Sequence, residues 1–404
     1  MSSSTPHQIF VSYSHRDQPW LDRLRAHLAP LEQSGELRLW IDHGQLEAGH
    51  RYNDEIAAAI ESSSAAILLV SPDFQSSRFV QEKELPLLRQ HADSGQLRLF
   101  WLPVSECLLA DQFQQIYQSG SGASTPLTSL SAHQADQVLA NLARQLQAYV
   151  RQSRRQSAQN ASRENPFLNS LGMPFVPVPG TGVLFCAWQT RVQDYAVFAD
   201  HRFSADRSWR DVVFAGCLQE ATHPVVNVSA QDAQDFCDWL SKVEGFTYRL
   251  PSDQEWSCAA GLSQKERTGS SPAKKDLQVR NHFPWGTQWP PPPETGNFAG
   301  EETETLGFDP IPGYQDGFLF TAPVGSFQPN ALGLYDLSGN VWEWCLDAYD
   351  PKDPATKVAR GGSWRDGDPI RLSSSLRRPA LATKRRHDLG FRCVLDLGRG
   401  TRNR

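Results

Sequence analysis

The 404 residues carry a formal net charge of -6, a sequence pI near 6.0, and 10% aromatic side chains. A chain of this length predicts two or three domains, each large enough to bury a core. The negative balance argues against nucleic acid or an anionic membrane as the main partner. Among the seven cysteines no Cys-x-x-Cys pair occurs, so neither a zinc ribbon nor a disulfide framework is indicated.

Apolar runs are short throughout the chain. None reaches the length of a membrane span, and the first residues lack the basic and apolar regions of a signal peptide. We therefore expect a cytoplasmic protein with no membrane partner. All but three of the tryptophans lie after residue 187, which indicates that the two halves differ in kind.

The first hundred residues alternate between short apolar runs and amphipathic runs. Strands are expected at 9–12, 37–41, 66–70 and 97–104, and helices at 19–31, 53–62 and 79–91. Several strands are apolar throughout, which predicts a parallel sheet covered on both faces. Ligands of such folds bind at the carboxyl ends of the strands.

Polar motifs follow three of these strands, at 12–17 (Ser-Tyr-Ser-His-Arg-Asp), 42–50 and 71–77. Over about residues 7–108 they resemble the TIR domain family in its bacterial form. The resemblance implies a flavodoxin-like α/β fold, which we place at 7–150. It also implies self-assembly with other TIR domains, through the loop after the second strand.

Active TIR domains cleave NAD+ between nicotinamide and ribose with one glutamate, which matches Glu84 here, with Glu82 as the alternative register. Cleavage builds positive charge on the ribose carbon, and a fixed carboxylate stabilises that charge. Two aromatic walls and two polar contacts are expected around the substrate: Tyr13, Phe79, Ser14 and Asp42. The alternative is a domain that only assembles, in which the acids complement the helix dipole and the rings are core.

A helix is expected at 135–151, because Val138, Leu142 and Leu146 recur on one face. Residues 151–165 are Arg, Gln, Ser and Asn almost throughout, which predicts a flexible linker between domains. A solvated linker is favoured over contact of its arginines with nucleic acid. Residues 398–404 are expected to form a basic tail.

Glycines beside large aromatic residues mark the second half, in the runs 339–344 (Gly-Asn-Val-Trp-Glu-Trp), 360–364 (Arg-Gly-Gly-Ser-Trp) and 390–392 (Gly-Phe-Arg). They predict short strands and tight loops around buried rings. With 223–229 and 248–251 upstream, they resemble the formylglycine-generating-enzyme, or sulfatase-modifying-factor, family. The resemblance implies an α+β variant of the C-type lectin fold, which we place at 166–397.

Active members of that family hold copper with two cysteine thiolates just after the Gly-Gly-Ser-aromatic run. Residues 365–376 contain no cysteine, and serine or aspartate does not replace sulfur as a ligand of copper(I). We therefore expect no copper and no formylglycine-generating oxidase activity.

The same resemblance implies two structural Ca2+ ions, held by carboxylates, amides and backbone carbonyls. The matching positions are Asn297, Phe298, Asp316 and Phe318 for the first ion, and Asp336, Gly339, Val341 and Glu343 for the second. In the alternative interpretation, Asp336 and Glu343 are ordinary turn and capping carboxylates.

The segment 365–389 occupies the recognition surface in this family. Its arginines and lysines outnumber its aspartates, which favours an anionic partner, either a ligand or a protein. It also resembles the variable region of proteins diversified by retroelements. The positions expected to vary and to contact ligand are Arg365, Asp366, Gly367, Asp368, Ser373, Ser375, Arg378, Lys384, Arg386 and His387.

Two hypotheses of different class follow. In the first, ligand recognition by the second domain clusters TIR domains and triggers NAD+ cleavage in bacterial defence or signalling. In the second, the chain is a non-enzymatic TIR adaptor or display protein, the target of a diversity-generating retroelement.

Overall fold

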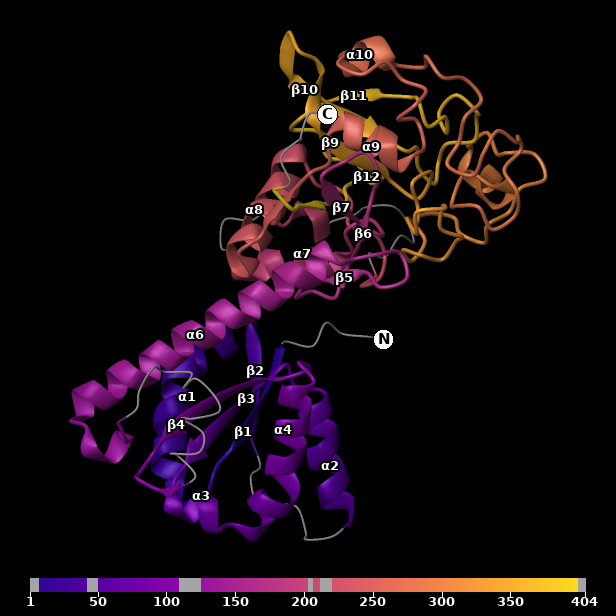
Figure 1. Cartoon of the computed structure of the whole chain (residues 1–404). Coiled ribbons are helices and arrows are strands. Elements are labelled where there is room, and N and C mark those ends of the chain that lie inside the picture. The colour runs from indigo at the N-terminus through magenta and orange to yellow at the C-terminus, as the bar shows by residue number, and fades with distance from the viewer. Residues whose placement is uncertain (1–6, 42–49, 109–124, 203–205, 211–219, 399–404) are drawn as a thin grey trace. The chain divides into compact units, whose positions relative to one another are not determined.

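The computed structural model describes residues 7–41, 50–108, 125–202, 206–210 and 220–398 (Figure 1). The chain divides into two compact units, Met1–Gln156 and Ser157–Arg404. No helix within the described ranges combines the length and the hydropathy needed to cross a membrane.

Four parallel strands form the centre of the first unit, in the order β2-β1-β3-β4. They are β1 (His7–Ser12), β2 (Leu37–Ile41), β3 (Ala65–Val70) and β4 (Arg98–Pro103). The connecting elements are η1 (His15–Asp17), α1 (Gln18–Gln33), α2 (His50–Glu61), α3 (Pro72–Ser76), the π-helical turn η2 (Val80–Glu84) and α4 (Leu85–Asp93). The expected parallel sheet is thereby confirmed.

Side chains alternate between the two faces of this sheet along each strand, and each face is covered by a separate core. On β3, Ile67 and Leu69 pack into a core with the apolar residues of α1 and α6. Leu68 and Val70 point the other way, into a core with α2 and α4. A strand apolar at every position is therefore required here.

A long helix, α6 (Ala132–Gln159), follows the short turn η3 (Leu127–Ser129) and continues past the last residue of the first unit, Gln156. The expectation of a flexible linker at 151–165 is wrong for its first part, because the helix continues to Gln159. The sequence here lacks an amphipathic face, yet Arg, Gln and Ala are all good helix formers. Ala158 is fully buried against residues of the second unit's core, which fixes the last turn.

Two small sheets organise the second unit, one with the order β5-β6-β7-β13-β8 and one with the order β11-β10-β9-β12. The first contains β5 (Phe167–Leu168), β6 (Pro174–Pro177), β7 (Val183–Cys186), β8 (Thr247–Arg249) and β13 (Val394–Asp396). The second contains β9 (Trp342–Asp350), β10 (Asp353–Arg360), β11 (Arg378–Leu381) and β12 (Leu389–Gly390). Short strands were expected from the glycine-aromatic runs, and the α+β architecture is confirmed.

The helical elements of this unit are α7 (Val192–His201), η4 (Ser208–Arg210), α8 (Ala230–Glu244), α9 (Asp253–Ala259), α10 (Pro272–Lys275) and η5 (Glu301–Leu306). Local chemistry fixes the ends of α8. Ser229 caps its first turn and Asp232 returns the hydrogen bond, while Gly245 adopts the left-handed conformation that ends it. The helix buries Phe236 and Leu240 in the main core of the unit.

Candidate functional site

The carboxyl end of β1 lies against the turn that carries the predicted catalytic glutamate. Ser12, the last residue of β1, donates a hydrogen bond from its hydroxyl to the Glu84 carboxylate. Glu84 is only 5% exposed and ends the π-helical turn η2. Such turns change which way a helix points its side chains and are frequent at functional sites.

Glu82, the alternative register, lies on the same turn but differs in environment. Its side chain is exposed and pairs with Arg78 at 2.7 Å, one helical turn away. The two glutamates therefore differ in burial. Glu84 is the one held at the edge of the sheet where ligands of such folds bind.

A second buried polar pair lies at this same edge. The Ser71 hydroxyl, just after β3, donates to Asp17 at 2.5 Å and accepts from the Phe74 amide at 3.0 Å. Burial raises the pKa of the Asp17 carboxyl. Sequence reasoning did not single out Ser12, Asp17 or Ser71 individually, although all three lie in the polar motifs that follow the strands.

The other residues expected around the substrate include two aromatic rings, which pack against the cores on opposite faces of the sheet. The half-buried Tyr13 donates to Gln18 at 3.0 Å and packs on the α1 side of the sheet. Phe79 packs against the opposite core, with α2 and α4. Ser14 precedes η1, where its carbonyl accepts from the Asp17 amide at 2.7 Å. Asp42 lies outside the described residues.

In the second unit, the predicted ligand-contacting positions divide by burial. Lys384 is exposed, and six others are half-buried: Arg365, Gly367, Asp368, Arg378, Arg386 and His387. Asp366, Ser373 and Ser375 are buried, at 1%, 5% and 0% exposure, so their side chains do not reach the surface at which a ligand would bind.

The buried members of the segment hold its framework. Asp366 accepts from the indole of Trp342 at 2.9 Å and from Ser363 at 2.7 Å. Ser375 accepts from the amide of Val279 at 3.2 Å. Gly367 is also constrained, because an added Cβ would lie 2.2 Å from the carbonyl oxygen of Asp309.

Arg377 fixes the middle of the segment 365–389 to the interior of the unit. Its guanidinium is fully buried and bonds Asp253 at 3.0 Å and Glu266 at 2.5 Å. Arg360, whose guanidinium also pairs with Asp253, and Lys275, 2.9 Å from the same carboxylate, complete a buried ionic network. The buried ion pairs thereby hold the middle of the segment 365–389 in place.

A cavity of about 260 Å³ opens between β11 and the loop that follows it. Three of the predicted positions, Arg378, Lys384 and Arg386, line this cavity together with Trp342. The guanidinium carbon of Arg378 lies 5.2 Å from the centre of the Trp342 ring, a cation–π contact.

Cations outnumber carboxylates beside this cavity. The buried Asp388 binds Arg386 at 2.7 Å and lies 3.9 Å from Arg378 and 4.0 Å from Arg365. Burial opposes its ionisation, but the adjacent guanidinium groups hold the pKa of Asp388 below its usual range. Three guanidinium groups thus share one carboxylate, and Lys384 adds a further positive charge at the rim.

The first set of predicted calcium positions leaves a buried acceptor without a donor. The Asn297 side chain is fully buried, and its Oδ1 has no hydrogen-bond partner among the described residues. Asp316 accepts from the amides of Phe298 at 2.8 Å and Phe318 at 2.9 Å. Burial and the neighbouring Glu302 raise the pKa of Asp316 to about 8. An amide oxygen and two carboxyl groups are donor types that Ca2+ binds.

Glu302 was not among the calcium positions predicted from the sequence. Its Oε1 accepts from the amides of Asp316 at 2.9 Å and Gly317 at 3.0 Å, and its Oε2 is buried without a partner in the described part of the chain. The sequence of η5 contains three glutamates within four residues, at 301, 302 and 304, and does not indicate which of them turns inward.

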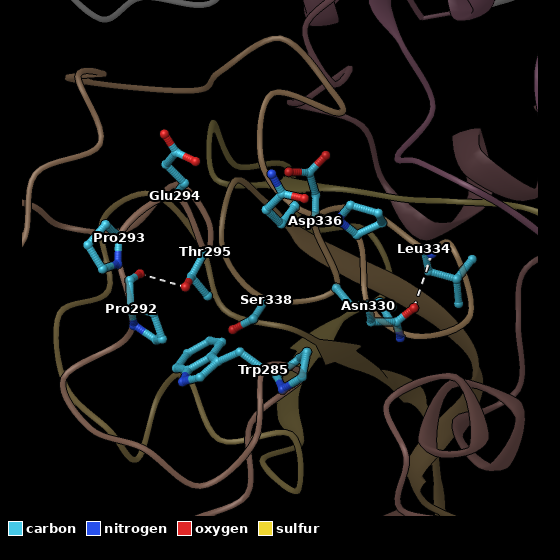
Figure 2. A pocket seen from close by; sticks show the side chains of 13 residues that line it. Trp285, Pro292, Pro293, Glu294, Thr295, Asn330, Leu334, Asp336 and Ser338 are labelled. Atoms are coloured by element: carbon cyan, nitrogen blue, oxygen red, sulfur yellow. Dashed lines mark hydrogen bonds between the residues drawn. The ribbon is translucent and has the colours of Figure 1, made fainter.

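The second set does converge, but on a protein group. Asp336, Gly339, Val341 and Glu343 all offer oxygen atoms to the side-chain nitrogen of Gln189. The Asp336 carboxyl also lines a cavity of about 250 Å³ beside Trp285 and several prolines (Figure 2). Burial raises the pKa of Asp336 to about 6. This set does not fit Ca2+ as it stands, because a nitrogen donor already occupies its centre.

Comparison with known proteins agrees with these two units. A family model described as sulfatase-modifying factor enzyme 1-like domain matches residues 143–397, and a TIR domain model matches residues 9–125. Inactive C-alpha-formylglycine-generating enzyme 2 of Bos taurus is 33% identical over 193 residues, covering 46% of this chain and 54% of that protein. Formylglycine-generating enzyme of Mus musculus is 31% identical over 202 residues, covering 44% and 46%.

The chain spans about half the length of these relatives. Among solved structures, Treponema denticola variable protein 1 aligns with a TM-score of 0.35 and 19% identity, covering 53% of this chain and 84% of that chain. Since the first family model matches more than half of the residues, the chain belongs to the sulfatase-modifying factor enzyme 1-like family and carries a TIR domain on its amino-terminal side.

Proposed function

We propose that the chain is a receptor. Its sulfatase-modifying-factor-like domain recognises an anionic ligand, and its TIR domain responds by self-assembly and cleavage of NAD+. The observation that carries the enzymatic half is the burial of Glu84 against Ser12, at the carboxyl edge of the parallel sheet.

The proposed reaction is hydrolysis of the bond between nicotinamide and the ribose of NAD+. As that bond breaks, its electron pair leaves with nicotinamide, which becomes neutral, and positive charge develops on the ribose carbon. The Glu84 carboxylate stabilises that charge, and water attacks the carbon to give ADP-ribose and a proton. One carboxylate suffices, because the leaving group needs no proton.

Glu82 provides a matched control for this proposal. We expect Glu84→Gln to abolish nicotinamide release, because glutamine keeps the shape and the acceptor for Ser12 but not the charge. Glu82→Gln removes an exposed charge two residues away and should retain activity. The measurement is NAD+ loss and nicotinamide release by the full chain at high concentration, alone and clustered on a multivalent scaffold.

Two results would contradict the enzymatic half. One is clustered wild-type protein that leaves NAD+ intact. The other is cleavage that survives Glu84→Gln, since the activity would then come from another group or a contaminant.

The recognition half rests on the cavity lined by Arg378, Lys384 and Arg386. Its surplus of positive charge favours a phosphate or carboxylate, and the Trp342 ring adds a flat apolar wall. Rigid anchoring by Arg377 keeps these groups in place before a ligand arrives, which lowers the entropy cost of binding.

Inorganic phosphate is a simple probe of this cavity. Phosphate should raise the thermal midpoint of the full chain more than sodium chloride does at equal ionic strength. Lys384→Ala and Arg378→Ala should remove that difference, while Lys352→Ala, an exposed lysine elsewhere in the same unit, should retain it. An equal response of all four proteins would show that the cavity does not select anions.

A second candidate function is the non-enzymatic adaptor or display protein. The observation in its favour is the packing of Tyr13 and Phe79 against the two cores of the sheet, as expected where these rings are core residues. This function predicts concentration-dependent assembly of the TIR domain without NAD+ loss. Light scattering and the nicotinamide assay on the same sample distinguish the two functions.

A further inference from the structure

The side chain of Gln189 is fully buried at the centre of a cage of oxygen atoms. Its Nε2 lies 2.9 Å from the carbonyl of Val341, 3.1 Å from a carboxylate oxygen of Glu343, and 3.2 Å from the carbonyl of Asp336. A fourth oxygen, the Gly339 carbonyl, lies 3.5 Å away. These are the four residues that the family resemblance assigns to a calcium ion.

We propose that the amide nitrogen of Gln189 substitutes for a calcium ion in this cage. Distances of 2.9 to 3.2 Å are those of N–H···O hydrogen bonds, whereas Ca2+ binds oxygen at about 2.3–2.6 Å. The nitrogen and an ion cannot share the centre. An amide NH2 group carries two protons, so it draws together oxygen atoms that would otherwise repel one another.

The charge inside the cage is also compensated by the protein. Arg392, fully buried, donates to both oxygens of Glu343 at 2.6 and 2.8 Å, and Trp256 donates to one of them at 3.0 Å. Glu343 therefore has a cation before any metal arrives. A divalent ion in the cage would lie beside the buried Arg392 guanidinium, where the repulsion between the two positive charges is little screened.

The first set of positions differs in the property that matters. Among the described residues both sets contain a buried oxygen without a donor, Asn297 Oδ1 in the first and Asp336 Oδ1 in the second, but only in the second does the nitrogen of Gln189 contact a carboxylate of the set. Calcium binding by this chain, where it occurs, is therefore assigned to the first set alone. The two sets can be separated by substitution.

Calcium stoichiometry of the full chain, measured by equilibrium dialysis against chelator-treated buffer, tests the proposal. We expect the wild type to bind at most one ion, and Asp316→Asn to bind none. An Asp316→Asn protein that still binds one ion, or a wild type that binds two, would overturn the proposal, because the second cage would then hold calcium.

Gln189→Glu supplies the converse test, since it exchanges the amide nitrogen for an oxygen. The variant should be less stable than the wild type in chelator and should recover with calcium, binding one ion more than the wild type. A folded Gln189→Glu protein with unchanged stoichiometry would refute the role of the nitrogen. Should that variant fail to fold, the Asp316→Asn result decides the question.

Discussion

Truncation of Arg377 to alanine should strongly destabilise the second unit. Its guanidinium donates to Asp253 and Glu266 and is fully buried with both. Without it, Asp253 keeps Arg360 and Lys275, but the Glu266 carboxylate loses its cation in a buried site. Removing one partner of a buried ion pair costs about 3–5 kcal/mol. For a unit of this size, that corresponds to a fall in the thermal midpoint of roughly 6–20 °C.

Scanning calorimetry of the full chain measures this shift. Arg267→Ala, one residue after Glu266 and exposed, is the control and should change stability by no more than about 0.5 kcal/mol. Adding Glu266→Gln to Arg377→Ala removes the orphaned charge and should restore part of the loss. A fall below about 2 °C for Arg377→Ala would refute the reasoning, because the network would then contribute little net stability.

Three further changes test other parts of the structure. Burial lowers the pKa of His7 to about 4, so as pH falls the unfolded chain takes up a proton before the folded chain does. The first unit should therefore be about 1–2 kcal/mol less stable at pH 5 than at pH 7. Urea titrations of His7→Gln should show a weaker dependence of stability on pH. Gly367→Ala places a methyl group against the Asp309 carbonyl and should cost about 1–3 kcal/mol by thermal unfolding. Ser229→Ala removes the cap of α8 and should cost about 1 kcal/mol, with no change in nicotinamide release.

The arrangement of the first unit could be predicted from the sequence because its signals are local. The strand expected at 37–41 coincides with β2, and alternating burial along β3 explains a run that is apolar at every position. The choice between Glu84 and Glu82 could not be made in the same way. A π-helical turn moves side chains off the usual helical period, so the sequence spacing does not tell which carboxylate faces β1.

Long-range contacts set the limits of prediction in the second unit. Asp366 is buried because Trp342 reaches it, and Ser375 because the chain near Val279 covers it. Neither partner is a sequence neighbour, so a polar loop residue could not be recognised as buried. Gln189 lies still farther in sequence from the residues of its cage, 147 to 154 positions away, and its neighbours in the sequence do not indicate a metal-like role.

The alternation of buried and exposed residues in 365–389 has a practical consequence for library construction. Exposed positions such as Lys384 can be randomised without removing a buried contact, whereas His387 packs against the buried Trp364 and Asp368 accepts from the amides of Ile370 and Arg371. Including Arg377 or Asp366 in the same pool would fill it with misfolded clones. The segment thus divides into side chains that hold the fold and side chains that are open to variation, and a library belongs at the second group.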